Sequence, residues 1–137
     1  MTAPCLACGY DATARVVARR EFVVPRDLPS LNQRIHNGAR GWQYRKARAA
    51  WYADFTIIRY AQKIPAAKAS RRVTLVRMYS KHQRLMDKAN VDTKVCVDAL
   101  VLAGLLKDDA PQWLELHVKQ ERGKERGTRV LIEEVSQ

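Results

Sequence analysis

The chain has few acidic residues, few cysteines and no long apolar run. Its 137 residues include 14 Asp and Glu against 25 Lys and Arg, which gives a formal net charge of +11. An excess of this size in a short chain favours a polyanionic partner, with nucleic acid ahead of a membrane surface. Hydrophobic residues make up 47% of the chain and charged residues 28%, a composition that indicates a folded domain and excludes a disordered tail.

Three cysteines, an odd number, argue against a disulfide framework of the secreted kind. Cys5 and Cys8 have the CxxC spacing of half a zinc knuckle, but no second pair follows, so we interpret them as free thiols. No apolar run approaches the roughly 20 residues of a membrane span, and residues 1–10 lack the apolar core of a secretory signal. We therefore expect a cytoplasmic protein that does not enter a membrane.

Residues 1–14 show no sustained periodicity, and we expect a flexible leader there, followed by one domain at 15–137. In chain order, the patterns first predict a strand at 15–25, a loop at 28–41 and a helix at 44–64 ended by Pro65. They then predict an inner strand at 71–79 and a helix at 91–103 closed by Gly104. The last predicted elements are strands at 114–118 and 129–135, joined by a polar linker at 120–128. This order predicts an α+β fold, a single domain with a mixed β-sheet packed by two main helices.

Aromatic and basic side chains alternate around the start of the first predicted helix. Trp42, Tyr44 and Tyr52 are interleaved with arginines and lysines, an arrangement that suits stacking on unpaired bases while the charges hold phosphates. Trp51 lies on the apolar stripe of the helix, so we expect it in the core. The basic residues of the first turn have the wrong sign for the helix dipole, which indicates a purpose other than helix stability.

Two clusters of basic side chains are candidates for contacts with the DNA backbone. The first cluster surrounds the start of the first helix and the second surrounds the last turn; the residues are Arg34, Arg40, Arg45, Lys46 and Arg48, then Lys119, Arg122, Lys124 and Arg126. His36, His82 and His117 have no partner at metal-ligand spacing, and we interpret them as structural or phosphate-facing.

A run of acidic residues accompanies the second predicted helix. Asp98 is the only charged residue between Val95 and Leu106, and an ionised carboxylate among apolar side chains needs a cation or hydrogen-bond donors. Lys94, one turn earlier, has the spacing of an i,i+4 pair with it. The adjacent carboxylates of Asp108 and Asp109 repel each other unless a positive charge lies beside them.

Several acids, an Asn and a Lys on one helix and its flanking loops suit a hard divalent cation, Mg²⁺ with Mn²⁺ as a substitute. The candidate ligands are Asp87, Asn90, Asp92, Asp98, Asp108 and Asp109. The alternative is a helix start where the dipole favours Asp87 and Asp92, followed by a solvated pair of aspartates. The net charge favours the metal site, because a nuclease needs an acidic pocket on a basic surface.

The segment 87–109, DKANVDTKVCVDALVLAGLLKDD, resembles the RusA family of Holliday junction resolvases. That family shows a D-x-D-N…K-x-x-x-D-A-L…A-G…D-D signature. The motifs at 98–100, 103–104 and 108–109 match without a gap, and Lys94 stands four residues before Asp98 as the lysine of the family does. The likeness extends over roughly residues 20–135 and implies a RusA-like fold.

The sequence departs from the signature at the acids before the asparagine. If Asn90 takes the place of the motif asparagine, Asp87 is the first acid, Ala89 replaces the second, and one residue is inserted before Lys94. Without the insertion, Lys88 and Asn90 fall at the acid positions. We prefer the first register because it keeps one acid and the asparagine, and Asp92 then supplies the missing carboxylate.

The resemblance implies a Mg²⁺-dependent endodeoxyribonuclease that nicks four-way junctions or other branched DNA as a homodimer. Asp87, Asn90 and Asp109 are the expected principal ligands, with Lys94 stabilising the phosphorane or orienting the attacking water. One alternative is a basic DNA-binding protein without catalysis, in which Ala89 has emptied the metal site. Another is a basic structural protein that binds RNA.

Overall fold

The computed structural model describes residues 15–31, 41–81, 83–87 and 90–136. The predicted leader at 1–14, with Cys5 and Cys8, lies outside these residues. So do most of the predicted loop at 28–41, and with it Arg34 and Arg40, and the histidines at 36 and 82.

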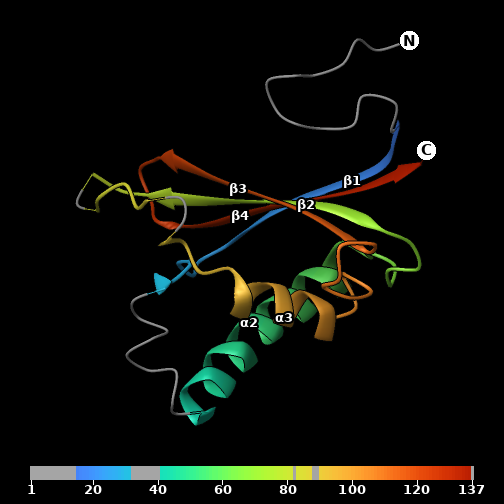
Figure 1. The fold of residues 1–137 in the computed structure, drawn as a ribbon, viewed down its shortest axis with the longest axis horizontal. Helices are drawn as coiled ribbons and strands as arrows, with labels where there is room; N and C mark the ends of the chain where they lie inside the picture. Colours follow the sequence, from blue (N-terminus) through green and yellow to red (C-terminus); the bar gives the residue numbers. More distant parts are fainter. Residues whose placement is uncertain (1–14, 32–40, 82, 88–89, 137) are drawn as a thin grey trace.

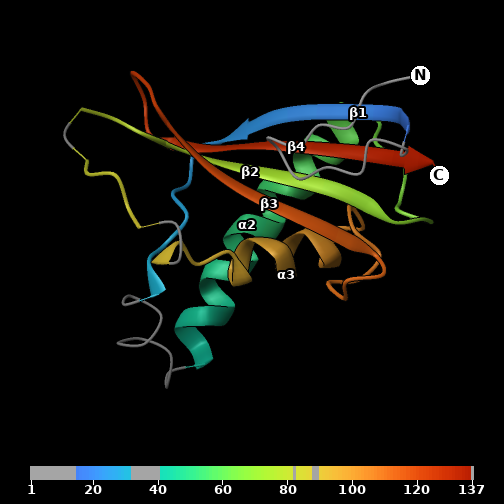
Figure 2. The same ribbon diagram turned by 45° about the horizontal axis from the view of Figure 1, so that its top comes forward.

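The described chain forms an α+β domain in which two helices cover one side of a four-stranded sheet (Figures 1 and 2). The spatial order of the strands is β1-β4-β2-β3, with β2 parallel to β3 and antiparallel to β4, and β1 antiparallel to β4. The prediction of a mixed sheet packed by two helices is confirmed. The elements are β1 (Arg15–Val24), α2 (Gly41–Ala61), β2 (Arg71–Tyr79), α3 (Lys94–Leu102), β3 (Leu114–Arg122) and β4 (Gly127–Ser136).

Strand β2 is an inner strand, with β4 on one side and β3 on the other, as its two largely apolar faces predict. All of residues 71–77 are buried, and Val73 and Leu75 belong to the core on the helix side. Because β2 and β3 are parallel, a tight turn cannot join them, and the chain needs a crossover. Helix α3 lies in that crossover and is thereby placed along the sheet.

Helix α2 supplies the aromatic part of the core. The ring of Trp51 lies 5.7 Å from that of Phe55, which in turn meets Phe22 of β1 edge-on at 6.0 Å. Trp51 is buried, which confirms its predicted place in the core. Aromatic contacts of this kind add about 0.5–1.5 kcal/mol beyond the area they bury, so this cluster joins α2 firmly to the sheet.

Both ends of α2 differ from the prediction of 44–64. The helix begins at Gly41, so Arg45, Lys46 and Arg48 lie in its second turn rather than the first, where the dipole acts less on them. It ends at Ala61, before Pro65, because Lys63 adopts a left-handed conformation with φ of 53°. The Ile64 N–H then donates to the Arg59 carbonyl at 3.0 Å, which closes the helix without proline.

Helix α3 is shorter than the predicted 91–103. Val91 pairs with Ser30 as an isolated bridge, so the helix starts only at Lys94. At its other end the prediction for Gly104 is confirmed: this residue has φ of 81°, and the Leu105 N–H donates to the Leu100 carbonyl at 3.0 Å.

Strands β3 and β4 extend beyond the predicted 114–118 and 129–135, so the linker between them is only residues 123–126. Lys119 and Arg122 therefore lie on strand β3 and not in the turn. The linker crosses the end of β2, where the Gly123 N–H donates to the Tyr79 carbonyl at 3.0 Å. Alternating charged residues on an edge strand resemble a polar linker in sequence, which explains the difference.

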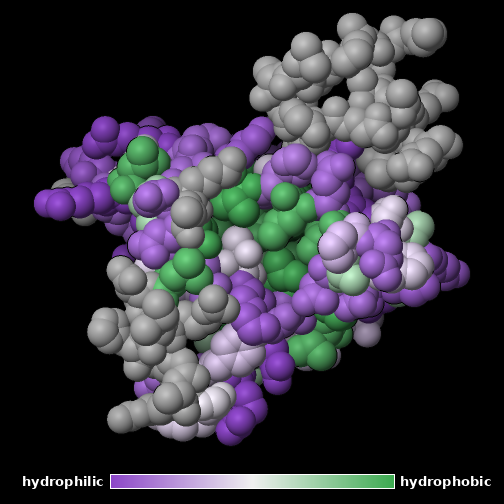
Figure 3. Space-filling view, in the orientation of Figure 1, coloured by the Kyte–Doolittle hydropathy of each residue, from purple (hydrophilic) through white to green (hydrophobic). Residues whose placement is uncertain are grey.

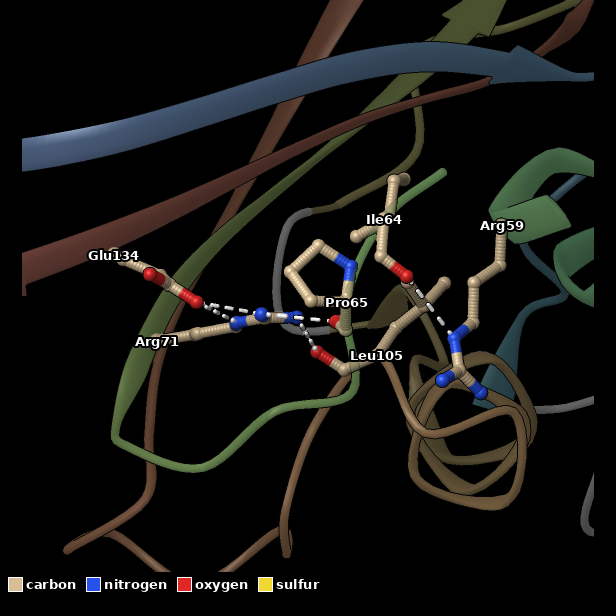
Figure 4. A network of polar contacts seen from close by, with 6 residues as sticks. All are labelled: Arg59, Ile64, Pro65, Arg71, Leu105 and Glu134. Atoms are coloured by element: carbon tan, nitrogen blue, oxygen red, sulfur yellow. Dashed lines mark hydrogen bonds and ion pairs between the residues drawn. The ribbon is translucent and has the colours of Figure 1, made fainter. Parts of the chain in front are cut away.

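Arg71 joins the segments that follow both helices to the sheet (Figure 4), and Arg59 joins α2 to the end of α3. The buried Arg71 of β2 donates to the carbonyls of Leu105 at 2.8 Å and Pro65 at 3.2 Å, and it forms a salt bridge with Glu134 at 2.5 Å. Arg59 of α2 donates to the Ala103 carbonyl at 2.9 Å. These guanidinium groups satisfy carbonyls that follow the helix ends and would otherwise be buried without a partner.

We predict that Gly104→Ala destabilises the protein by about 1–2 kcal/mol. The positive φ strains an L-residue there, and an added Cβ would lie 2.8 Å from Nη1 of Arg59. Urea unfolding measures the loss. In the control Gly123→Ala, the nearest atom to the added Cβ is the Glu125 carbonyl oxygen at 3.7 Å, and we expect a change within about 0.5 kcal/mol. Equal stability of the two variants would contradict this account of the turn.

Candidate functional site

The start of α3 forms one wall of a cleft of about 450 Å³. Its charged lining residues are Asp92, Lys94, Asp98 and Asp109, and apolar side chains of β3 and the preceding loops complete it. Figure 3 shows a hydrophobic area in the middle of this face, between the sheet and the helices, bordered by hydrophilic side chains. The residues that line the cleft thus combine acidic groups with apolar side chains.

A second cleft, of about 280 Å³, lies between α2 and α3. Arg48, Asp98, Asp108 and Asp109 line it, together with apolar residues of α3. Asp98 and Asp109 line both clefts, so these two carboxylates mark the junction between them. We call Asp98 and Asp109 the acidic junction; Lys94 lines the cleft on one side of it and Arg48 the cleft on the other.

Asp98 is held by two donors on its Oδ2 atom. Lys94 Nζ lies 3.4 Å away, which confirms the predicted i,i+4 pair. The Tyr44 hydroxyl of α2 donates to the same oxygen. The sequence pattern indicates only stacking on bases for Tyr44, because no local spacing connects residues 54 positions apart.

Tyr44 also lies close to both cations of the site. Lys94 Nζ is 5.8 Å and Arg48 Cζ 5.6 Å from the centre of its ring, distances at which cation–π attraction operates. Burial raises the pKa of the Tyr44 hydroxyl, and its hydrogen bond to Asp98 raises that pKa further. The hydroxyl thus keeps its proton at neutral pH and remains a donor to Asp98.

Asp92 has a local structural role at the start of α3. Its side chain is buried at 4% exposure, and Oδ1 accepts the Lys94 N–H at 3.1 Å. This bond satisfies one of the free N–H groups of the first helical turn. Asp92 therefore positions Lys94 whether or not it also binds a metal.

The remaining predicted ligands are distributed unevenly. Asp108 is exposed, and its Oδ1 accepts the Asp109 N–H at 2.8 Å. Asp87 and Asn90 are not among the described residues that line either cleft; the Asn90 N–H donates to the Asp87 carbonyl at 2.8 Å within a turn. Within the described ranges, no group of three or more Asp, Glu, His or Cys side chains is arranged to hold a metal ion.

The donor chemistry of the acidic junction nevertheless fits Mg²⁺. This ion prefers oxygen ligands, keeps several waters and is commonly bound through one or two protein carboxylates. Asp98 and Asp109 would provide these two, with Asp92 and Asp108 on the adjoining walls.

The predicted DNA-binding residues that are described lie on the surface. Arg45 and Lys46 are exposed on α2 and Arg48 is partly buried. The second cluster, Lys119, Arg122, Lys124 and Arg126, is exposed on β3 and the linker after it. Arg129, which follows this cluster, forms ion pairs with Glu21 and Glu121.

His117 has a structural partner on the charged face of the sheet. Its Nε2 lies 2.8 Å from Glu115, which also accepts from Arg72 at 2.5 Å. Burial raises the pKa of Glu115, but its hydrogen bonds with His117 and Arg72 outweigh this effect and leave the pKa below its usual value.

No protein-family model matches the chain, and no curated protein matches its sequence. The RusA resemblance therefore stays a prediction based on the motif at 87–109. Among the described helices, none is long and apolar enough to cross a membrane.

We predict that Asp92→Ala lowers the free energy of unfolding by about 0.5–1.5 kcal/mol, the net contribution of one hydrogen bond, because it removes the acceptor of the Lys94 N–H. Asp92→Asn keeps the acceptor oxygen, so we expect most of that stability to return. Urea unfolding of both variants tests the bond to Lys94. An equal loss in the two variants would show that the charge of Asp92 matters and the acceptor does not.

Proposed function

We propose that this protein is a Mg²⁺-dependent endodeoxyribonuclease that nicks branched DNA, four-way junctions above all, by phosphodiester hydrolysis. The acidic junction carries the proposal, since it places two carboxylates between two clefts on a chain with a net charge of +11. Carboxylates at such a place repel a phosphate unless a cation joins them. The RusA-like motif at 87–109 adds support from the sequence.

The side chains around the acidic junction have distinct roles in this proposal. Lys94 lines the larger cleft and holds its ammonium group beside Asp98, where it would stabilise negative charge on the phosphorane or orient the attacking water. Tyr44 is a positioning residue, because its hydroxyl fixes the Asp98 carboxylate from another helix. Arg48 would hold a phosphate of the bound strand from the second cleft.

Bound Mg²⁺ would neutralise charge on the scissile phosphate and activate a water. Asp98 and Asp109 would hold it. Asp87 and Asn90, which the motif resemblance implies as ligands, line neither of the two clefts. Mn²⁺, which also accepts oxygen ligands, would replace Mg²⁺.

The proposal includes a homodimer. Two symmetric nicks across a junction need two active sites, and a twofold dimer provides them.

A basic DNA-binding protein without catalysis is the second candidate. Two observations favour it: Oδ2 of Asp98 is already bonded to Tyr44 and Lys94, and the described acidic residues do not form a compact group of three. A structural protein that binds RNA is a third. Nicking of DNA in Mg²⁺ separates the first candidate from both others, and competition between DNA and RNA separates the last two.

We predict that the affinity for DNA falls steeply with salt and that log K against log [salt] is linear. Contact with about six phosphates lowers the affinity by about 10³-fold between 50 and 200 mM salt. Lys124→Ala in the second basic cluster should reduce the magnitude of the slope of log K against log [salt] by about 0.9, because each phosphate contact contributes about that much to the slope. Lys68→Ala, an exposed lysine outside both clusters, should leave it unchanged. Equal affinity at low and high salt would rule out the electrostatic interface.

We predict that Asp109→Asn lowers the nicking rate on a synthetic four-way junction by orders of magnitude while the affinity stays equal or rises. The substitution keeps the shape of the side chain but removes a negative ligand and a repulsion on phosphate. Glu125→Gln is the matched control, since it removes one exposed acid outside both clefts; at saturating junction concentration, where affinity no longer limits the rate, it should leave nicking unchanged. Undiminished nicking by Asp109→Asn would contradict the assignment of the acidic junction as the active site. No nicking by the unmodified chain would support the binding protein instead.

A further inference from the structure

A third cleft, of about 310 Å³, adjoins the acidic junction along α2. It is lined by Arg45, Arg48, Ala49, Tyr52 and Leu102. Arg48 and Leu102 also line the cleft that contains Asp98 and Asp109. The two clefts are therefore continuous, with a basic end on α2 and an acidic end at the junction.

We propose that this third cleft binds one unpaired base of a DNA strand whose neighbouring phosphate lies at the acidic junction. The placing of the neighbouring phosphate at the acidic junction rests on the proposed nuclease function, whereas the base site rests on the residues of the cleft alone.

The lining residues suit a nucleotide on chemical grounds. Tyr52 is 42% exposed and Leu102 56%, so two large apolar side chains lie open to water within one small cleft. A base offers a flat apolar face to an aromatic ring, and such stacking does not depend on the base sequence. Arg45 and Arg48 on the same wall provide guanidinium groups for the phosphates on either side of that base.

The size and surroundings of the cleft favour a single base over a paired one. About 310 Å³ is at the lower end of the volumes that hold small ligands, and a base pair in a duplex cannot reach a side chain in such a recess. Arg48 is held beside the ring of Tyr44, with its Cζ atom 5.6 Å from the ring centre. Its guanidinium group is therefore already positioned to meet a phosphate. Branched DNA has unpaired or weakly stacked bases where its arms meet, which links the cleft to the proposed substrate.

The test compares two DNA duplexes of equal length, one fully paired and one with a single unpaired 2-aminopurine. Affinity and 2-aminopurine fluorescence are measured with the full chain in EDTA, so that the result does not depend on catalysis. We expect tighter binding to the second duplex and quenched fluorescence on binding. Tyr52→Ala should lose about ten-fold in affinity for that duplex and little for the paired one. Tyr52→Phe, which keeps the ring, should bind as the unmodified protein does.

Tyr60→Ala is the matched control. Tyr60 lies on the same helix at 74% exposure and outside this cleft, so its loss should change neither affinity. Equal losses on both duplexes with Tyr52→Ala, or no loss on either, would overturn the base site. A free 2-aminopurine nucleotide could also be added as a competitor. If it displaced the bound DNA as effectively as the duplex with the unpaired base does, the ligand of the cleft would be a single nucleotide and not a DNA strand, which would overturn that part of the proposal. If the unmodified chain never nicks DNA but passes this test, the nuclease proposal fails and the base site stands.

Discussion

The parallel pairing of β2 with β3 is the constraint on which the site depends. Parallel neighbours cannot be joined by a hairpin, so the chain must leave the sheet and return at the end from which β2 began. Helix α3 fills that crossover, preceded by Asp92 and followed by Asp109, and both residues line one cleft with Asp98. The antiparallel β4 then gives β2 a second neighbour, which buries it on both edges.

Two arginines, the buried Arg71 and the half-buried Arg59, stabilise the return part of this crossover. Arg71 and Arg59 bind the carbonyls of Leu105 and Ala103, on either side of the Gly104 turn. A buried guanidinium is costly to desolvate, and Glu134 together with these carbonyls offsets that cost. The turn holds the chain just before Asp108 and Asp109. The same contacts that pack the core therefore also fix the position of the acidic junction.

Features with a local signal could be predicted from the sequence. The two apolar faces of β2, the glycine after α3 and the spacing of Lys94 and Asp98 each depend on residues close together in the chain. The bond between Tyr44 and Asp98 and that between Arg71 and Glu134 join residues 54 and 63 positions apart, and no periodicity encodes such pairs. The metal ligands inferred from the motif are gathered only in part, because Asp87 and Asn90 are not among the described residues that line either cleft.

The proposed function requires above all that the acidic junction binds a divalent cation. Crystals of the protein soaked in Mn²⁺ test it directly, because the anomalous signal locates the ion independently of activity. The account predicts one Mn²⁺ between the carboxylates of Asp98 and Asp109, lost in the Asp109→Asn variant. Ordered Mn²⁺ elsewhere on the protein, or an empty junction at saturating Mn²⁺, would contradict it.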